Sequence, residues 1–422
     1  MLIQRASLLG NKVVDIRLGE QIEQVAESLR PLPGELVLDA GFGTVLPGLH
    51  DHHLHVYSAA AELNSVRVGP QDVRDSDGLA QALTRAVPGA DGWIRAVGYH
   101  DTVAGPLDRD LLDALAPPNP IRVQHRSGVM WTLNSAGLAA VGLADHPDGR
   151  LRSADRAWSD VLERTEPPLD AFSAGLAAYG VTGVTDATPD LDITVRIRQR
   201  VHVLAPGKRI LHDDALDLDA LITWISDRHT EGIPVALHCV TAAQLVVAIA
   251  ALRVAGRHPG DRIEHAAMVP ADCIADLAGL GVTVVTQPNF VAERGDQYRT
   301  DVPATEQDQL WRLASLRYAG VPVALSTDAP FGDSDPWAAM RAAVHRRSPT
   351  GQVLNAAECV DARTALTLFL GSATQPARPR TVAPGQPADL CVLSAPPREA
   401  LGQLDAGLVV ATVIGGAMVF TR

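Results

Sequence analysis

The chain has 422 residues, of which 46% are hydrophobic and 20% charged, a composition typical of a globular protein with a large core. Its 36 basic and 49 acidic side chains give a net charge of −13, and no run is rich in Lys or Arg, which argues against nucleic acid or an anionic membrane as the main partner. No apolar stretch approaches the roughly 18 residues of a membrane span, and the N-terminus lacks the pattern of a signal peptide.

Both ends of the chain are predicted to be rich in β-structure. Apolar runs bounded by turn residues predict strands at 2–9, 13–18, 35–38, 385–393, 408–414 and 418–421. Because chain termini often lie close together, we predict one small β domain made from residues 1–46 and 376–422.

The most informative segment is PGLHDHHLH at residues 47–55. An H-x-H pair on an extended strand places both imidazoles on one face, because side chains alternate with period two. Two neutral imidazoles at one strand end make half of a divalent metal site. The alternative for this segment taken alone is a His-rich loop.

More candidate strands follow this motif than a barrel can use before residue 238. They are residues 93–99, 121–124, 181–186, 201–204 and 208–211. An eight-stranded barrel has room for only three here, so part of 56–168 is predicted to be an insertion after the first strand. We expect it to lie over the strand ends, where loops build substrate selectivity.

The middle of the chain alternates short apolar strands with amphipathic helices. Predicted strands are 235–238, 262–265, 282–287 and 323–328, and predicted helices are 242–255, 270–280, 307–319 and 336–345. This alternation favours a parallel α/β sheet or barrel, in which strand C-termini converge. His238, His265 and Asp328 end three of these strands and are therefore expected to meet the H-x-H pair.

The cysteines indicate a reducing compartment. Cys239, Cys273, Cys359 and Cys391 stand far apart with no C-x-x-C pair, as expected for reduced thiols in a cytoplasmic protein. Alternation places Cys239 on the face opposite His238, which argues against a thiol nucleophile. The chain also lacks complete dinucleotide, phosphate-loop, H-E-x-x-H and G-x-S-x-G motifs.

Together these segments resemble the amidohydrolase superfamily of metal-dependent hydrolases, in particular its YtcJ-like (amidohydrolase 3) branch. The segments that carry the resemblance are 47–55, 180–186, 262–265, 326–330 and 335–336, with 134–138 and 385–393 in addition. The resemblance spans nearly the whole chain. It implies an α/β fold, a distorted (β/α)8 TIM barrel over 47–375 with the insertion after strand 1 and a small β-sandwich formed by both termini.

The resemblance also implies a mono- or binuclear metal centre. His53 and His55 would be the ligands from strand 1, His238 and His265 those from strands 5 and 6, and Asp328 the carboxylate from strand 8. Lys208 matches the carboxylated lysine that bridges two metals in binuclear members; the alternative is a solvated lysine after a turn. Zinc is the expected metal, with iron, manganese and nickel as alternatives.

Such a site implies hydrolysis of a C–N bond in an amide, formamide or cyclic amide other than a peptide. Zinc lowers the pKa of bound water to about 7, and the resulting hydroxide attacks the carbonyl carbon. Asp328 would take the proton from the water and hand it to the leaving nitrogen.

Residues near other strand ends are candidates for substrate contacts. They are Tyr99, His100, Arg126, Trp131 and Gln287. An arginine there would suit a carboxylate or carbonyl oxygen of a small-molecule substrate. Asp51 and Asp186 are candidates to orient ligand histidines.

Two other functions stay open on the sequence. One is a mononuclear deaminase of an amino-heterocycle, although the CVTAAQ segment after His238 lacks the carboxylate that deaminase-like members often carry there. The other is a non-catalytic scaffold, against which the complete set of ligand-type residues argues. A homodimer is compatible with the sequence.

Overall fold

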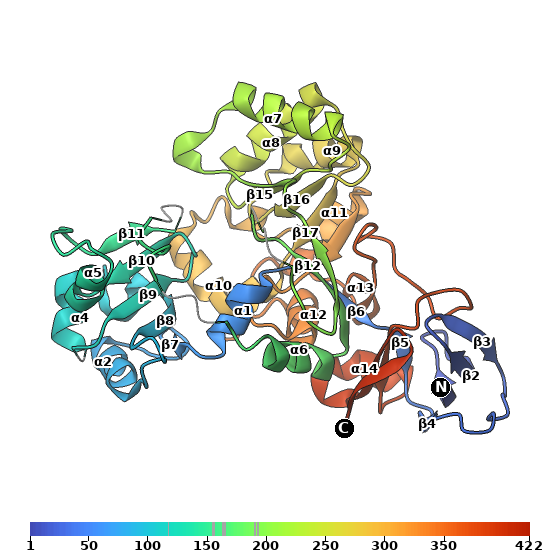
Figure 1. The fold of residues 1–422 in the computed structure, drawn as a ribbon. Helices are drawn as coiled ribbons and strands as arrows, with labels where there is room; N and C mark the ends of the chain where they lie inside the picture. Colours follow the sequence, from blue (N-terminus) through green and yellow to red (C-terminus); the bar gives the residue numbers. More distant parts are fainter. Residues whose placement is uncertain (117, 154–156, 163–165, 190, 192–193) are drawn as a thin grey trace. The chain divides into compact units, whose positions relative to one another are not determined.

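The computed structural model describes residues 1–116, 118–153, 157–162, 166–189, 191 and 194–422 (Figure 1). The chain divides into two compact units. One combines Met1–Val56 with Ser173–Arg422, and the other is Tyr57–Phe172.

The first unit is built around two parallel sheets. One has the order β13-β12-β6 and the other the order β14-β15-β16-β17-β18. The strands are β6 (Leu49–Leu54), β12 (Val181–Asp186), β13 (Arg200–Val203), β14 (Lys208–Ile210), β15 (Ala236–Cys239), β16 (Arg262–His265), β17 (Thr283–Thr286) and β18 (Val323–Leu325). Neighbouring strands within these sheets pair in parallel, so their C-terminal ends lie together.

The chain just beyond β18 joins the two sheets by bonding to β6. The amide of Asp328 donates to the carbonyl of His53 at 2.9 Å, and the amide of His55 donates to the carbonyl of Ala329 at 2.8 Å. The buried Asp51 carboxylate reinforces this junction by accepting hydrogen bonds from the backbone amide and hydroxyl of Thr327. The first and last parallel strands therefore meet at the strand ends where the sequence predicts ligands.

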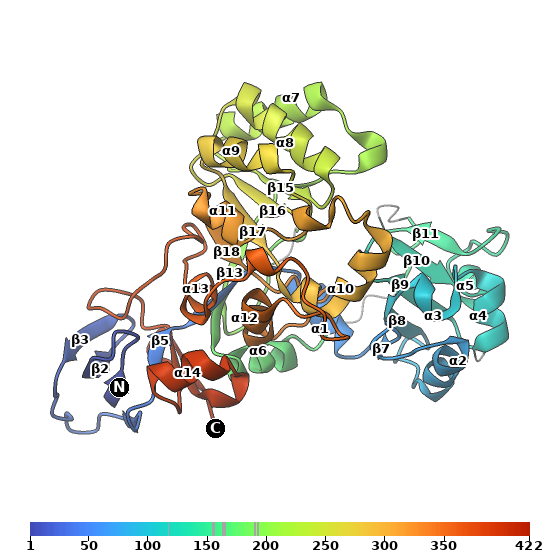
Figure 2. The same ribbon diagram turned by 180° about the vertical axis from the view of Figure 1, so that it is seen from behind.

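Helices follow the strands and cover them. They are α7 (Leu218–Thr230), α8 (Ala242–Ala255), α9 (Ala271–Leu280), α10 (Asn289–Asp301), α11 (Ala314–Tyr318), α12 (Pro336–His345) and α13 (Ala362–Thr367). Figures 1 and 2 show α7, α8 and α9 side by side along β15 and β16. The bounds of α8 equal the predicted ones, because a capping box between Thr241 and Gln244 fixes its first turn.

The predicted helix at 307–319 is wrong. The segment forms a 3₁₀ turn, Gln307–Gln309, and then the short α11, and between them Trp311 has a φ of 50°. A left-handed residue interrupts a right-handed helix. The buried Arg346 stabilises this course by donating to the carbonyls of Trp311 and Leu310 at 3.0 and 3.1 Å. The helix that follows β17 is instead α10.

Strands from both termini form two further sheets that share one core. The sheet β3-β2-β1-β4 consists of β1 (Leu2–Ser7), β2 (Val13–Leu18), β3 (Ile22–Ala26) and β4 (Val37–Asp39). The sheet β21-β20-β19-β5 consists of β5 (Val45–Pro47), β19 (Leu390–Leu393), β20 (Val409–Ile414) and β21 (Ala417–Thr421), with α14 (Pro397–Gln403) between β19 and β20. Buried residues of both sheets, among them Ile16 and Val392, pack in one cluster. The extra β-structure from the two termini is therefore confirmed.

The second unit has its own sheet, in the order β11-β10-β9-β8-β7. Its strands are β7 (Val66–Arg67), β8 (Ile94–Tyr99), β9 (Ile121–His125), β10 (Met130–Leu133) and β11 (Arg150–Arg152), and its helices include α2 (Ser76–Arg85), α3 (Asp101–Ala104), α4 (Arg109–Leu115) and α5 (Ser135–Ala140). The helices α1 (Val56–Glu62) and α6 (Leu169–Ala178) carry the chain into and out of this unit. Within the described residues no helix is long and apolar enough to cross a membrane.

Candidate metal centre

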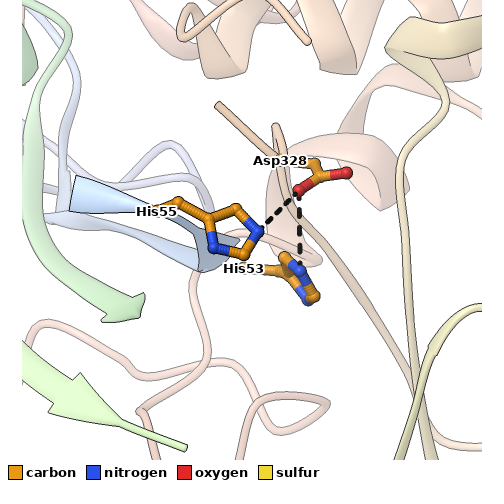
Figure 3. A group of neighbouring side chains, drawn as sticks. All are labelled: His53, His55 and Asp328. Atoms are coloured by element: carbon orange, nitrogen blue, oxygen red, sulfur yellow. Dashed lines mark ion pairs between the residues drawn. The ribbon is translucent and has the colours of Figure 1, made fainter. Parts of the chain in front are cut away.

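The strand ends of the first unit bring a compact polar group together (Figure 3). His53 lies in β6, His55 follows it, and Asp328 lies just beyond β18. One ligand atom from each lies within 4.8 Å of the others. The Asp328 Oδ1 atom is 3.5 Å from Nε2 of His53 and 3.5 Å from Nε2 of His55. This is the arrangement expected of an H-x-H pair that shares a cation with a carboxylate.

Two further predicted ligands stand beside this group. The His265 Nδ1 atom is 3.7 Å from Asp328 Oδ2, and its ring centroid is 4.7 Å from that of His53. The His238 ring lies 4.4 Å from the His265 ring, centroid to centroid. The predicted histidines therefore form a continuous line of contacts, in which His53, His55 and Asp328 make the tightest part.

Three of these imidazoles are oriented by a polar partner at Nδ1. His53 bonds to the Glu264 carboxylate, His265 to Oε1 of Gln287 at 2.9 Å, and His55 to the hydroxyl of Thr188 at 3.2 Å. The Glu264 carboxylate and Gln287 Oε1 are acceptors, so they fix the proton on Nδ1 of His53 and His265 and leave Nε2 with a lone pair for a metal. Within the group, Nε2 is thus the metal-facing nitrogen.

Burial keeps the imidazoles of His53, His238 and His265 uncharged. Loss of contact with water lowers the pKa of His53 and His265 well below the ordinary value, and it lowers that of His238 to about 3. Neighbouring cationic side chains, including Lys208, add to the effect. A neutral imidazole is the form that binds a metal ion.

Lys208, the first residue of β14, is buried, so the alternative of a solvated lysine is wrong. Its side chain is only 6% exposed, and Nζ has no hydrogen-bond partner. Burial lowers the pKa of Lys208 to about 8, against the opposing influence of Glu264 and Asp328. An amine with such a pKa has a far larger neutral fraction near physiological pH than an ordinary lysine, and the neutral amine is the form that reacts with CO₂.

Several buried polar atoms lack a partner in this region. Among the described residues, Asp328 Oδ1, His265 Nε2 and Lys208 Nζ are each buried without a hydrogen bond. Buried groups of this kind are costly unless something satisfies them. A divalent cation is a fitting partner, because imidazole nitrogen and carboxylate oxygen are zinc ligands. The residues present therefore fit a metal.

The backbone at two of these positions is left-handed. His265 has a φ of 69° and Asp328 a φ of 57°. Such conformations are uncommon for residues other than glycine and are often found at functional sites. At His265 the turn interrupts strand alternation, which allows both Glu264 and His265 to contact His53.

Glu264 is the main site residue that the sequence analysis missed. It is fully buried, and it accepts hydrogen bonds from the Arg262 guanidinium at 2.6 and 3.0 Å while it contacts His53. The available signal was the pair of charged residues, Arg262 and Glu264, inside the short strand 262–265, because charged residues are seldom fully buried unless they are paired. Strict alternation would have placed Glu264 on the face opposite His265, so this signal did not point to the site.

Gln287 was predicted to contact substrate, and the structure corrects this. Its amide is fully buried, with Oε1 bonded to His265 and Nε2 donating to the hydroxyl of Ser326 at 2.8 Å. Both ends of the amide are therefore used to position His265.

Asp51 and Asp186 orient backbone and not ligand imidazoles. Asp51 accepts from the backbone amide of His53 and from Thr327. Asp186 accepts from the amides of Val56 and Thr188 at 2.9 and 2.8 Å. Each carboxylate thus holds the chain next to a predicted ligand, which is a different role from the predicted one.

The other predicted substrate contacts lie in the Tyr57–Phe172 unit. Tyr99 belongs to the core of that unit, and its hydroxyl donates to the carbonyl of Gly105 at 2.5 Å, so the structure gives it a packing role. His100 caps α3, and the Trp131 ring lies near the guanidinium groups of Arg95 and Arg122. His100, Arg126 and Trp131 stay predictions as substrate contacts.

Parallel strands ending in a histidine and carboxylate group, with β-sheets added from both termini, define a metal-dependent hydrolase fold. A model of the amidohydrolase family matches residues 36–420, and the chain belongs to this family. Its sequence is 23% identical over 494 residues to N-substituted formamide deformylase of Arthrobacter pascens, a match that covers 92% of this chain and 91% of that protein.

Solved structures share the fold. A metal-dependent hydrolase of Pyrococcus horikoshii superposes with a TM-score of 0.73 at 18% identity, covering 94% of this chain and 97% of that one. Atrazine chlorohydrolase of Arthrobacter aurescens, solved with zinc, superposes with a TM-score of 0.52 at 13% identity, covering 100% of this chain and 95% of that one.

Proposed function

We propose that this protein is a metal-dependent hydrolase that cleaves the C–N bond of an amide, formamide or cyclic amide other than a peptide. The observation that carries the proposal is the convergence of His53 Nε2, His55 Nε2 and an unpartnered Asp328 Oδ1 at the strand ends. The similarity to an N-substituted formamide deformylase supports this substrate class. The parallel strands serve as the distorted (β/α)8 barrel that the family implies.

His53, His55 and Asp328 would hold one cation, and His238, His265 and Lys208 are the candidates for a second. A bound divalent ion supplies Lewis-acid chemistry, since it polarises a carbonyl oxygen and lowers the pKa of water. Zinc is the proposed metal, and its presence in a structural relative supports that choice. Lys208, if carboxylated, would provide an oxygen ligand between two ions.

Asp328 is the proposed general base and acid. Its carboxylate reaches the centre from the left-handed turn after β18, with Oδ1 facing the two imidazoles of the H-x-H pair. It would accept a proton from water as a C–O bond forms at the carbonyl carbon. It would then deliver that proton to the nitrogen as the C–N bond breaks, so that an amine and a carboxylic acid leave.

The group of His53, His55 and Asp328 also suits a single cation, and this favours a second candidate function. A mononuclear deaminase of an amino-heterocycle would use this group and leave Lys208 outside the chemistry. Product analysis separates the two functions, because deamination releases ammonia and retains the carbon skeleton. A non-catalytic scaffold would have no need to keep the complete ligand set.

The first experiment measures metal per chain by elemental analysis of protein purified without chelators or a His-tag. The sequence holds two lysines, the buried Lys208 and the exposed Lys12, so Lys12→Ala is a matched control for Lys208→Ala. Close to two metals in the native protein and in Lys12→Ala, with fewer in Lys208→Ala, supports the binuclear hydrolase. One metal in all three favours the mononuclear alternative.

Substrate screening follows from this result. N-substituted formamides and simple amides are incubated with the metal-loaded protein, and the released amine and acid are quantified. Amino-heterocycles are tested in parallel for ammonia. A protein that takes up no metal on reconstitution and turns over neither class would overturn the proposal.

A further inference from the structure

A second site candidate lies at the opposite ends of the parallel strands. A cavity of about 820 Å³ is lined by residues that immediately precede strands, including Val235 before β15, Pro322 before β18 and the start of β16 at Arg262. His202 of β13 and the turn between β13 and β14 complete the wall. The candidate ligands His238, His265 and Asp328 stand near the C-terminal ends of β15, β16 and β18, so at these three strands the cavity lies on the other face. Lys208 is instead the first residue of β14, two positions after the lining residue Pro206.

Arg262 gives the cavity a buried cationic wall. The residue is 4% exposed, and its Nε and Nη2 atoms donate to Glu264 and to the carbonyl of His52. Its Nη1 atom is buried and has no hydrogen-bond partner. A guanidinium offers five N–H donors, and a buried donor left without an acceptor costs free energy.

The remaining polar wall also suits a negative ligand. His202 is half-buried near Arg262, whose charge contributes to lowering the pKa of this histidine below its ordinary value, after the larger effect of burial. Arg378 lies exposed among the lining residues. Among the described residues that line the cavity, none is acidic. Such a wall offers N–H donors to oxygen acceptors, and the Arg378 guanidinium adds a positive charge.

We propose that this cavity binds a small oxyanion, a carboxylate or a phosphate, at a site separate from the candidate metal centre. Its volume is within the range of small-molecule pockets, and its polar wall includes His202 and Arg378, with no acidic side chain among the described lining residues. This site does not depend on the proposed hydrolytic function. Arg262 also links it to the metal centre, since the same guanidinium holds Glu264 and Glu264 contacts His53.

The test is isothermal titration of the full chain with inorganic phosphate and, separately, with acetate at constant ionic strength. Each titration is repeated after a chelator has removed bound metal, because an anion that sits on the metal would be lost with it. We expect saturable binding of at least one of the two anions with a Kd in or below the millimolar range, about −4 kcal/mol, before and after metal removal.

Variants locate the binding. Arg262 is left intact, because replacing it would disturb Glu264 and His53. Ala377→Trp places a large side chain at a half-buried lining position and should abolish binding, and His202→Ala should weaken it by about tenfold. Arg378→Ala should weaken it less, and the equally exposed Arg398→Ala outside the cavity should leave it unchanged.

Each variant is first checked for an unchanged melting temperature and metal content. Absence of saturable binding by both anions would overturn the proposal. So would binding that Ala377→Trp and His202→Ala both leave intact, or binding that disappears when the metal is removed.

Discussion

Glu264 links His53, a candidate metal ligand, to Arg262 of the parallel strand β16. Its carboxylate is fully buried between the Arg262 guanidinium and the His53 imidazole. A carboxylate behind an imidazole fixes the tautomer of the ring and raises its basicity toward a metal. The residue should therefore act on metal affinity without touching the metal.

Replacing Glu264 with Gln preserves its size and removes its charge. We expect Glu264→Gln to weaken metal binding by about 10- to 100-fold, since partners of this kind contribute that much to affinity. Competition with a chromophoric chelator measures the change. Glu358→Gln is the control: Glu358 is also buried, but it caps α11 through Leu313 and Ser315, so it should lower stability and leave metal affinity alone. Equal metal affinity in wild type and Glu264→Gln would refute this role.

Asp328 should matter for turnover more than for metal content. Asp328→Asn keeps one oxygen near His53 and His55 but cannot hold the transferred proton, so kcat should fall by roughly 10² to 10⁴. Elemental analysis should find metal content near that of the native protein. Full activity in this variant would exclude Asp328 as the base.

At the scale of elements, the close packing of β12 against β6 holds the H-x-H strand in place. Gly183 of β12 stands opposite His50 of β6, and a Cβ on Gly183 would lie 2.5 Å from the His50 ring nitrogen Nδ1. His50 is itself held by a 2.9 Å bond to the Thr185 hydroxyl. A side chain at position 183 would therefore press on the strand that carries His53.

Gly183→Ala should lower the free energy of unfolding by about 1–3 kcal/mol, the usual cost of overpacking a well-filled interior. Gly279→Ala is a contrasting control, because Gly279 lies in α9 with open space around its Cβ position and should gain roughly 0.5–1 kcal/mol. Urea titrations of both variants measure the difference. A Gly183→Ala protein as stable as the wild type would contradict the packing argument.

The element scale also shows what the sequence could predict. The convergence of the candidate ligand histidines and Asp328 was predictable because short apolar strands end in them and parallel strands meet at their ends. The helix α10 was missed because its residues are mostly polar and Pro288 at its start provides no side-chain cap. The roles of Glu264 and Gln287 depend on the left-handed turn at His265, which no local pattern announces.

At the scale of the whole molecule, the first unit holds all the candidate ligands and the second unit holds none of them. A cation would tie β6 to the chain after β18 and would offset the cost of the buried, unpartnered Asp328 Oδ1. Metal binding should therefore stabilise one unit selectively.

Chelation should lower the melting temperature of the first unit and leave that of the second unchanged. A ligand present at 100 to 1,000 times its Kd contributes about 3–4 kcal/mol to the state that binds it. Calorimetry of metal-loaded and stripped protein should show one transition that shifts and returns on adding zinc. Hydrogen exchange assigns the shifted transition to its residues, and an equal shift over Tyr57–Phe172 would contradict the expectation.

The bond between Asp51 and Thr327 joins positions 276 residues apart, and this separation sets the order in which the centre can assemble. The strands β14 to β18 pair with neighbours that follow one another along the chain, so they can associate soon after synthesis. β6 is made early, but its partner β12 follows only after the whole Tyr57–Phe172 unit. Closing such loops is entropically costly and slow. His53 and His55 are therefore among the first candidate ligands to leave the ribosome and among the last to reach their place, and a nascent chain shorter than 328 residues cannot hold the complete centre.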